Sequence, residues 1–134
     1  MPENDVDPAS VTELDACPSS PNCVSSADSG DSHYIAPIAI DGDPDAAWQA
    51  LKDILTADSS IEITASAEHY IRTEATTRIL RFTDDVEFLL KGEERRIDMR
   101  SASRIGYSDL GKNRRRLERI RSAMIDAGVA VAPQ

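Results

Sequence analysis

The residues best suited to binding lie between Arg100 and Arg114, where arginines alternate with small polar side chains. A guanidinium group pairs with a carboxylate or phosphate through two parallel hydrogen bonds, and neighbouring hydroxyl and amide groups add donors. This segment leads from a predicted strand into a predicted helix, and free backbone N–H groups at a helix start attract anions. We therefore expect a binding site for a small anion or an acidic protein segment. The residues expected to form it are Arg100, Ser101, Ser103, Arg104, Tyr107, Ser108, Asn113 and Arg114.

The same segment has a second, purely structural interpretation. Ser108 or Asp109 would cap the helix, and the arginines would be solvated or paired with acidic side chains. The three arginines of the expected site interleave with small polar residues, and for them we favour an organised site. We favour the structural interpretation for the arginines inside the predicted helix, which are Arg115, Arg116 and Arg119.

A second group consists of three carboxylates within four residues, at Asp84, Asp85 and Glu87. In an extended strand Asp85 and Glu87 project to one side, about 7 Å apart, and Asp84 projects to the other. Such a group suits a divalent cation or an acid/base pair, but Asp-Asp at the head of a strand is also an ordinary turn composition, which we favour. The carboxylates are also candidate partners of the arginines, in buried ion pairs that would tie the last helix to the sheet.

The third group comprises the two cysteines, Cys17 and Cys23, which lie in a loop rich in proline and serine. We favour two reduced thiols, because a reducing compartment disfavours a disulfide across such a short loop. A disulfide is the next alternative. A zinc site would need His33 and His69 as further ligands, and these four residues have no recognised spacing. A catalytic nucleophile, Cys23 or Cys17 with His33 as its base, has suitable residue types but no motif.

The predicted elements that position these groups form an α+β fold. Apolar residues at helical spacing predict a helix over 43–58, with Asp43 as its N-cap, and a second helix over 110–127. Alternating apolar and polar residues between them predict an antiparallel meander. An edge strand is expected over 34–40, because Pro37 cannot donate a backbone hydrogen bond. We expect an antiparallel β-meander of four to six strands, two helices packed on one face, and a long N-terminal coil.

The predicted domain organisation is simple. Residues 1–32 form a partly ordered loop segment with both cysteines, residues 33–128 form a single α+β domain, and residues 129–134 form a C-terminal tail. No apolar stretch is long enough to span a membrane, and the N-terminus does not resemble a signal peptide. We therefore expect a cytoplasmic location.

Charge is distributed unevenly along the chain, whose formal net charge is −9. Residues 1–60 contain 12 acidic side chains and one basic side chain, Lys52, whereas residues 95–121 contain 10 basic and three acidic side chains. The net charge disfavours general binding to nucleic acid, which requires a surplus of basic residues. The uneven distribution is compatible with a localised anion site in the basic segment. It is also compatible with ion pairs between the acidic and the basic segment that neutralise each other within the protein.

Taken together, five motifs resemble one known family. They are CPSSPNCVSS at 17–26, HYIAPI at 33–38, GDPDAAW at 42–48, FTDDVEF at 82–88 and RSASRIGYSDLGKNR at 100–114. Combined in this order, over roughly residues 15–127, they are similar to the bacterial and plastid proteins grouped as domain of unknown function 1499. The resemblance implies no activity, because the family has none established.

The function that we favour is a binding or assembly module without a cofactor, which holds a small anion or an acidic partner. An enzyme with a Cys/His or a carboxylate–metal site is the first alternative. A purely structural arginine–carboxylate cluster is the second. The oligomeric state cannot be predicted from these residues.

Overall fold

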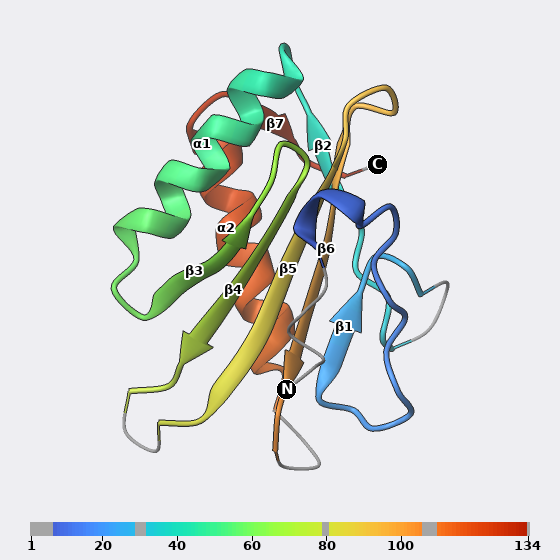
Figure 1. Ribbon diagram of the computed structural model, residues 1–134, viewed down its shortest axis with the longest axis vertical. Helices are drawn as coiled ribbons and strands as arrows, with labels where there is room; N and C mark the ends of the chain where they lie inside the picture. Colours follow the sequence, from blue (N-terminus) through green and yellow to red (C-terminus); the bar gives the residue numbers. More distant parts are fainter. Residues whose placement is uncertain (1–6, 29–31, 79–80, 106–109, 134) are drawn as a thin grey trace.

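The protein consists of one antiparallel sheet with two helices packed against one of its faces (Figure 1). The computed structural model describes residues 7–28, 32–78, 81–105 and 110–133. Six of the seven strands pair in the order β3-β4-β5-β6-β2-β7, and the seventh, β1, pairs with β6. The bounds of the elements are η2 Pro8–Ser10, β1 Cys23–Ser25, β2 Ile38–Ile40, α1 Pro44–Ala57, β3 Ile61–Ser66, β4 Tyr70–Thr76, β5 Thr83–Lys91, β6 Arg96–Ser103, α2 Lys112–Asp126 and β7 Ala130–Val131.

The first helix begins as its sequence predicts. The Asp43 carboxylate accepts hydrogen bonds from the backbone N–H groups of Asp45 and Ala46, and Pro44 occupies the first turn. One face of α1 is apolar and packs with α2 over the strands, so that the main core lies between sheet and helices. The expected α+β fold, with two helices on one face of an antiparallel sheet, is therefore confirmed.

The sheet has more strands than the meander alone would supply. The meander itself comprises the long strands β3 to β6, and three short strands join it beyond β6. β2 lies between β6 and β7, so the expectation of an edge strand there is wrong. β2 can lie inside the sheet because it begins at Ile38, directly after Pro37, and therefore does not need a backbone donor from that proline. β1 and β7 lie in segments expected to be loop and tail, while the division into three parts remains a prediction.

The second helix starts two residues later than expected. Gly111, at a φ of 81°, occupies the N-cap position and makes no side-chain cap bond. Leu110 is 84% exposed, so it does not belong to the apolar stripe of the helix. Ser108 and Asp109, the expected capping residues, lie outside the described residues.

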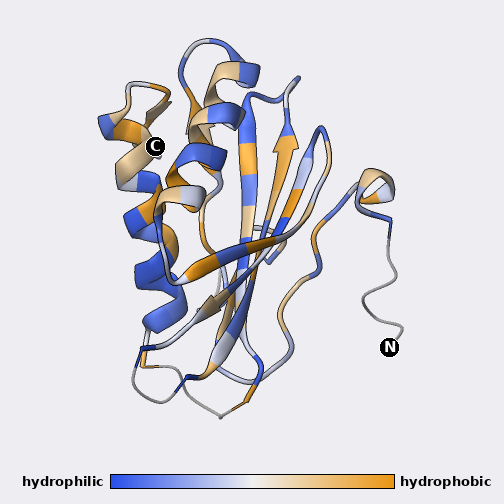
Figure 2. Ribbon diagram, turned by 60° about the vertical axis from the view of Figure 1, so that its left-hand side comes forward, coloured by the Kyte–Doolittle hydropathy of each residue, from blue (hydrophilic) through white to orange (hydrophobic). Residues whose placement is uncertain are grey.

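The N-terminal segment lies across the sheet face opposite the helices, which we call the open face (Figure 2). On that face Val11 and Leu14 pack against Tyr70 and Leu89 in a small second core. Part of the predicted coil is therefore ordered by contacts with the domain. Within the described part of the chain, no helix has the length and apolar character needed to cross a membrane.

Candidate functional site

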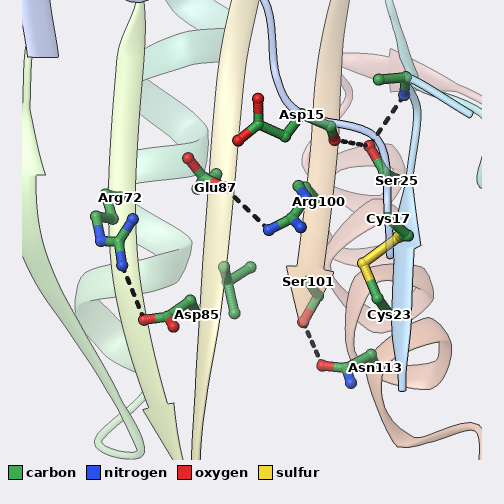
Figure 3. Close-up of polar contacts among 12 residues, drawn as sticks. Asp15, Cys17, Cys23, Ser25, Arg72, Asp85, Glu87, Arg100, Ser101 and Asn113 are labelled. Atoms are coloured by element: carbon green, nitrogen blue, oxygen red, sulfur yellow. Dashed lines mark hydrogen bonds and ion pairs between the residues drawn. A yellow bond between two sulfur atoms is a disulfide. The ribbon is translucent and has the colours of Figure 1, made fainter. Parts of the chain in front are cut away.

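The strand β6 divides the expected anion site between two faces of the sheet. Successive side chains of a strand point to opposite sides. Ser101 and Ser103 therefore face the helices, whereas Arg100 faces the open side together with Glu87 (Figure 3). The predicted residues consequently form separate clusters instead of one site. Tyr107 and Ser108, also expected to bind the ligand, lie outside the described residues.

The helix-side residues form a buried hydrogen-bond cluster centred on Asn113. Ser101 Oγ donates to Asn113 Oδ1 at 2.5 Å, and both side chains are fully buried. Asn113 Nδ2 donates to the backbone oxygen of Asn22 at 3.1 Å and to Ser103 Oγ at 3.0 Å. These contacts join β6, the start of α2 and the loop before β1, so their evident effect is structural.

The fully buried carboxylate of Asp84 lies beside this cluster. It forms ion pairs with Arg116 at 2.8 Å and with Lys112 at 3.1 Å. Arg116 also donates to Ser101 Oγ and Asn113 Oδ1, which places a charged triad within the polar cluster. The ion pair between helix and sheet that the sequence raised as an alternative is therefore present, with Arg116 as its main cation.

The open face contains a second group of ion pairs, centred on Asp85. Arg72 contacts Asp85 at 3.1 Å, and Arg104 holds both oxygens of Asp85 at 2.9 and 3.1 Å. Arg104 also pairs with Glu74 at 2.8 Å, and the hydrogen bonds that Arg104 donates to the Asp85 carboxylate raise the pKa of Arg104. Glu74 and Asp85 lie directly opposite each other in the sheet, so Arg104 offsets the repulsion between two like charges.

The neighbouring row of paired residues across the open face is centred on Glu87. Arg72 and Arg100 lie opposite Glu87 in the flanking strands, and Arg100 forms a loose ion pair with it at 3.6 Å (Figure 3). Tyr70 donates its hydroxyl to Glu87 at 2.5 Å, and burial together with this carboxylate raises the pKa of Tyr70 well above its usual range. We call the combined group the open-face network. Its members are Arg72, Arg100, Arg104, Glu74, Asp85 and Glu87.

The three carboxylates considered for a metal lie on two faces of the sheet. Asp85 and Glu87 belong to the open-face network, and Asp84 is buried beneath α2. Among the described residues, no three His, Cys, Asp or Glu side chains are grouped so that they could hold a cation. The geometry therefore gives no support to a site formed by these three residues.

The two cysteines form a disulfide bond in the structure (Figure 3). Both sulfur atoms are used, so neither residue presents the thiolate that a nucleophile requires. The favoured expectation of reduced thiols is therefore wrong. The bond closes the loop from Cys17 to Cys23, whose Asn22 carbonyl accepts hydrogen bonds from Asn113 and from the backbone of Ser103. His33, the expected base, lies with its Nε2 2.9 Å from the backbone oxygen of Ser20.

Arg114, the last residue of the expected site, holds the segment that precedes β2. Its guanidinium donates to the backbone oxygens of Ser32 and Tyr34, at 2.9 and 2.8 Å. Arg121 makes similar bonds to the backbone oxygens of Ala36 and Pro37. Both arginines therefore attach the backbone of residues 32–37 to α2.

Two cavities differ in the charges that line them. One, of about 710 Å³, lies on the open face and is lined by four acids but only one base, the paired Arg72. The other, of about 830 Å³, lies between α2, the end of α1, and strands β3 and β4. We call it the basic cleft, because five bases and three acids line it. The five bases are Arg78, Arg81, Lys112, Arg116 and Arg119.

Three arginines of the basic cleft form no ion pair among the described residues, although the charge of Arg119 acts on Asp58 in the same cavity. Lys112 and Arg116 hold Asp84, but among the described residues no carboxylate lies within ion-pair distance of Arg78, Arg81 or Arg119. The sequence did not identify this grouping, because Arg78 and Arg81 lie about forty residues before Arg119. Only the tertiary structure brings them to one cavity.

Comparison with known proteins identifies one family. The family model described as "Protein of unknown function (DUF1499)" matches residues 13–124. No curated protein and no solved structure matches the chain. The match spans nearly all of the described sheet and both helices, and the chain therefore belongs to the DUF1499 family of proteins of unknown function.

Proposed function

We propose that this protein is a binding module for a small acidic ligand, held in the basic cleft. The observation that carries the proposal is that Arg78, Arg81 and Arg119 line a cavity of about 830 Å³ without a carboxylate partner among the described residues. Cavities of this volume are in the range that small-molecule sites occupy in proteins. An acidic ligand would supply the negative charge with which these guanidinium groups can pair.

The chemistry of the cleft suits phosphate or carboxylate groups. Guanidinium groups bind both through paired hydrogen bonds. Hydroxyl groups of Ser59, Thr76 and Thr77 line the same cavity and can add donors. The first turn of α2 also contributes Lys112 to the lining, and the start of a helix favours negative charge.

The acidic residues of the cleft reduce its positive electrostatic potential without cancelling it. Glu74 is paired with Arg104, and Asp58 accepts hydrogen bonds from the backbone and hydroxyl of Ser60. Glu62 is exposed. Removing Glu62 should therefore strengthen anion binding, whereas removing a cleft arginine should weaken it.

Binding is favoured over catalysis by the composition of the lining. The described lining residues include neither histidine nor cysteine, the side chains that most often act as base and nucleophile near neutral pH. The proposal therefore keeps the chemistry expected from the sequence, recognition of a small anion, but moves it away from the Arg100–Arg114 segment. For Arg100 and Arg104, the contacts with Glu87 and Asp85 favour a structural role.

We also infer an oxidising compartment, in place of the cytoplasmic location expected from the sequence. Disulfides persist in oxidising compartments and are rare in the cytosol. The Cys17–Cys23 bond supports this inference. Alkylation of the protein in lysates of its native cells should label both thiols only after a reductant is added. Labelling of the two thiols without reductant would contradict the inference.

The proposed binding is tested by thermal unfolding with phosphate, pyrophosphate and citrate. At least one of these anions should raise the Tm of the wild-type protein, and Arg78→Gln/Arg119→Gln should abolish most of that increase. Lys52→Gln is the matched control, since Lys52 lies on α1 outside the lining of the cleft. An equal response in the double variant and the wild type would refute the proposal.

A further inference from the structure

We propose that the end of the molecule beside the basic cleft docks onto a membrane surface containing anionic lipids. The inference rests on the proposed function and deepens it, because it assigns the acidic group in the cleft to a lipid headgroup. It follows from two features that lie at the same end: large exposed apolar side chains and a surplus of positive charge.

Three exposed apolar side chains lie at this end, close to the start of β5, the end of β6 and the start of α2. Phe82 is 39% exposed, Ile105 is 60% exposed and Leu110 is 84% exposed. The backbone of Arg104 donates to Thr83, so Phe82 and Ile105 are the next residues across the β5–β6 pair. Leu110 directly precedes the N-cap of α2, where that helix meets the same end of the sheet (Figure 1).

Positive charge surrounds these apolar residues. The described residues of 76–85 and 103–116 contain seven bases but only two acids, Asp84 and Asp85. Both acids are already paired, Asp84 with Arg116 and Asp85 with Arg104. Among these described residues the net charge is therefore positive, in a protein whose formal net charge is −9.

This combination matches the chemistry of an anionic bilayer surface. Apolar side chains enter the boundary between headgroups and acyl chains, while basic side chains remain among the phosphates. Arg81 connects the two features, because it lines the basic cleft and directly precedes Phe82 in the chain. A lipid phosphate could therefore reach the cleft while Ile105 and Leu110 enter the bilayer boundary. A free anion would make no use of the apolar residues.

The experiment is flotation of the full chain with vesicles of phosphatidylcholine, alone or mixed with phosphatidylglycerol. We expect the protein to float with the mixed vesicles only, and the bound fraction to fall as salt is added. Ile105→Ser/Leu110→Ser should weaken binding by about tenfold, because two apolar side chains no longer leave water. Val131→Ser is the matched control: Val131 is 45% exposed but lies in β7, and this variant should bind as the wild type does.

The outcomes separate this inference from the proposed function. A wild-type protein whose Tm rises with soluble anions, but which floats with neither kind of vesicle, overturns the docking and leaves the cleft proposal standing. Absence of both responses overturns both. Vesicle binding that Ile105→Ser/Leu110→Ser does not weaken also overturns the docking. So does concentration-dependent dimerisation that this variant abolishes, because the apolar end would then bind a second copy of the chain.

Discussion

The open face of the sheet and the basic cleft differ in whether their arginines are paired with carboxylates. On the open face three arginines meet three carboxylates, and the strand register places Glu87 between Arg72 and Arg100. In the cleft three arginines share a cavity without such partners among the described residues. The difference shows that arginine content alone does not indicate a binding site. What distinguishes the cleft is charge left unpaired beside a cavity.

The buried ion pair beneath α2 provides the largest expected effect. Asp84→Ala would leave Arg116, whose side chain is 9% exposed, without its closest anion. Removing one partner of a buried pair costs about 3–5 kcal/mol, and we expect a loss of that size in the free energy of unfolding. Urea denaturation measures it. A loss comparable to that of an exposed pair would show that this cluster does not tie α2 to the sheet.

The disulfide provides the next largest effect. Cys17→Ser/Cys23→Ser removes a link across only six positions, and chain-entropy estimates give about 2 kcal/mol for so short a loop. The anion-dependent rise in Tm should persist, because neither cysteine lines the basic cleft. Urea denaturation of the wild type with and without reductant should reproduce the same loss. An unchanged free energy of unfolding would contradict a stabilising role.

Breaking the open-face network should have a smaller effect. Arg104 is 45% exposed, so Arg104→Ala should cost about 1 kcal/mol, which includes the repulsion left between Glu74 and Asp85. Glu74→Gln in the same background should recover part of the loss by removing one of the like charges. If Arg104→Ala abolished the response to anions while stability was unchanged, the network would be a binding site and the comparison would be reversed.

The smallest expected effect is a pH dependence from Asp58, at the edge of the cleft. The hydrogen bond from the Ser60 hydroxyl is the largest contribution that lowers the pKa of Asp58 below its usual 3.8. A lowered folded-state pKa stabilises the protein above the unfolded-state value, and this contribution is lost as the pH falls below 3.8. Asp58→Asn should therefore reduce the dependence of Tm on pH in that range. A steeper dependence in the variant would contradict the assignment.

The sequence predicts the elements that local patterns specify. Asp43-Pro44 marks the start of α1, and the alternation through Val86 and Phe88 correctly places Asp85 and Glu87 on the face opposite Asp84. β1 is three residues long and has no alternation of its own, since all three are buried against β6 and α2. Its position depends on tertiary pairing, which local pattern does not encode.

The candidate site is less predictable for the same reason. The spacing of Arg100 and Arg104 suggested one site, but the register across β5 and β6 provides each with a carboxylate. Arg116 was expected to be solvated or paired with an acidic side chain, and it is paired with Asp84 and buried, but the sequence does not indicate which acid lies beside it. The basic cleft joins Arg78 and Arg119 from distant parts of the chain. Periodicity cannot reveal a cavity assembled in this way.

The most direct test compares the pyrophosphate affinity of two variants by calorimetry. Arg78→Gln/Arg119→Gln removes unpaired charge from the cleft, whereas Arg104→Gln/Arg114→Gln alters the arginines that the sequence favoured. We predict about tenfold weaker binding for each cleft arginine removed, because each supplies a charge-assisted hydrogen bond, and little change in the second variant. Wild-type affinity in the first variant together with lost affinity in the second would contradict the account.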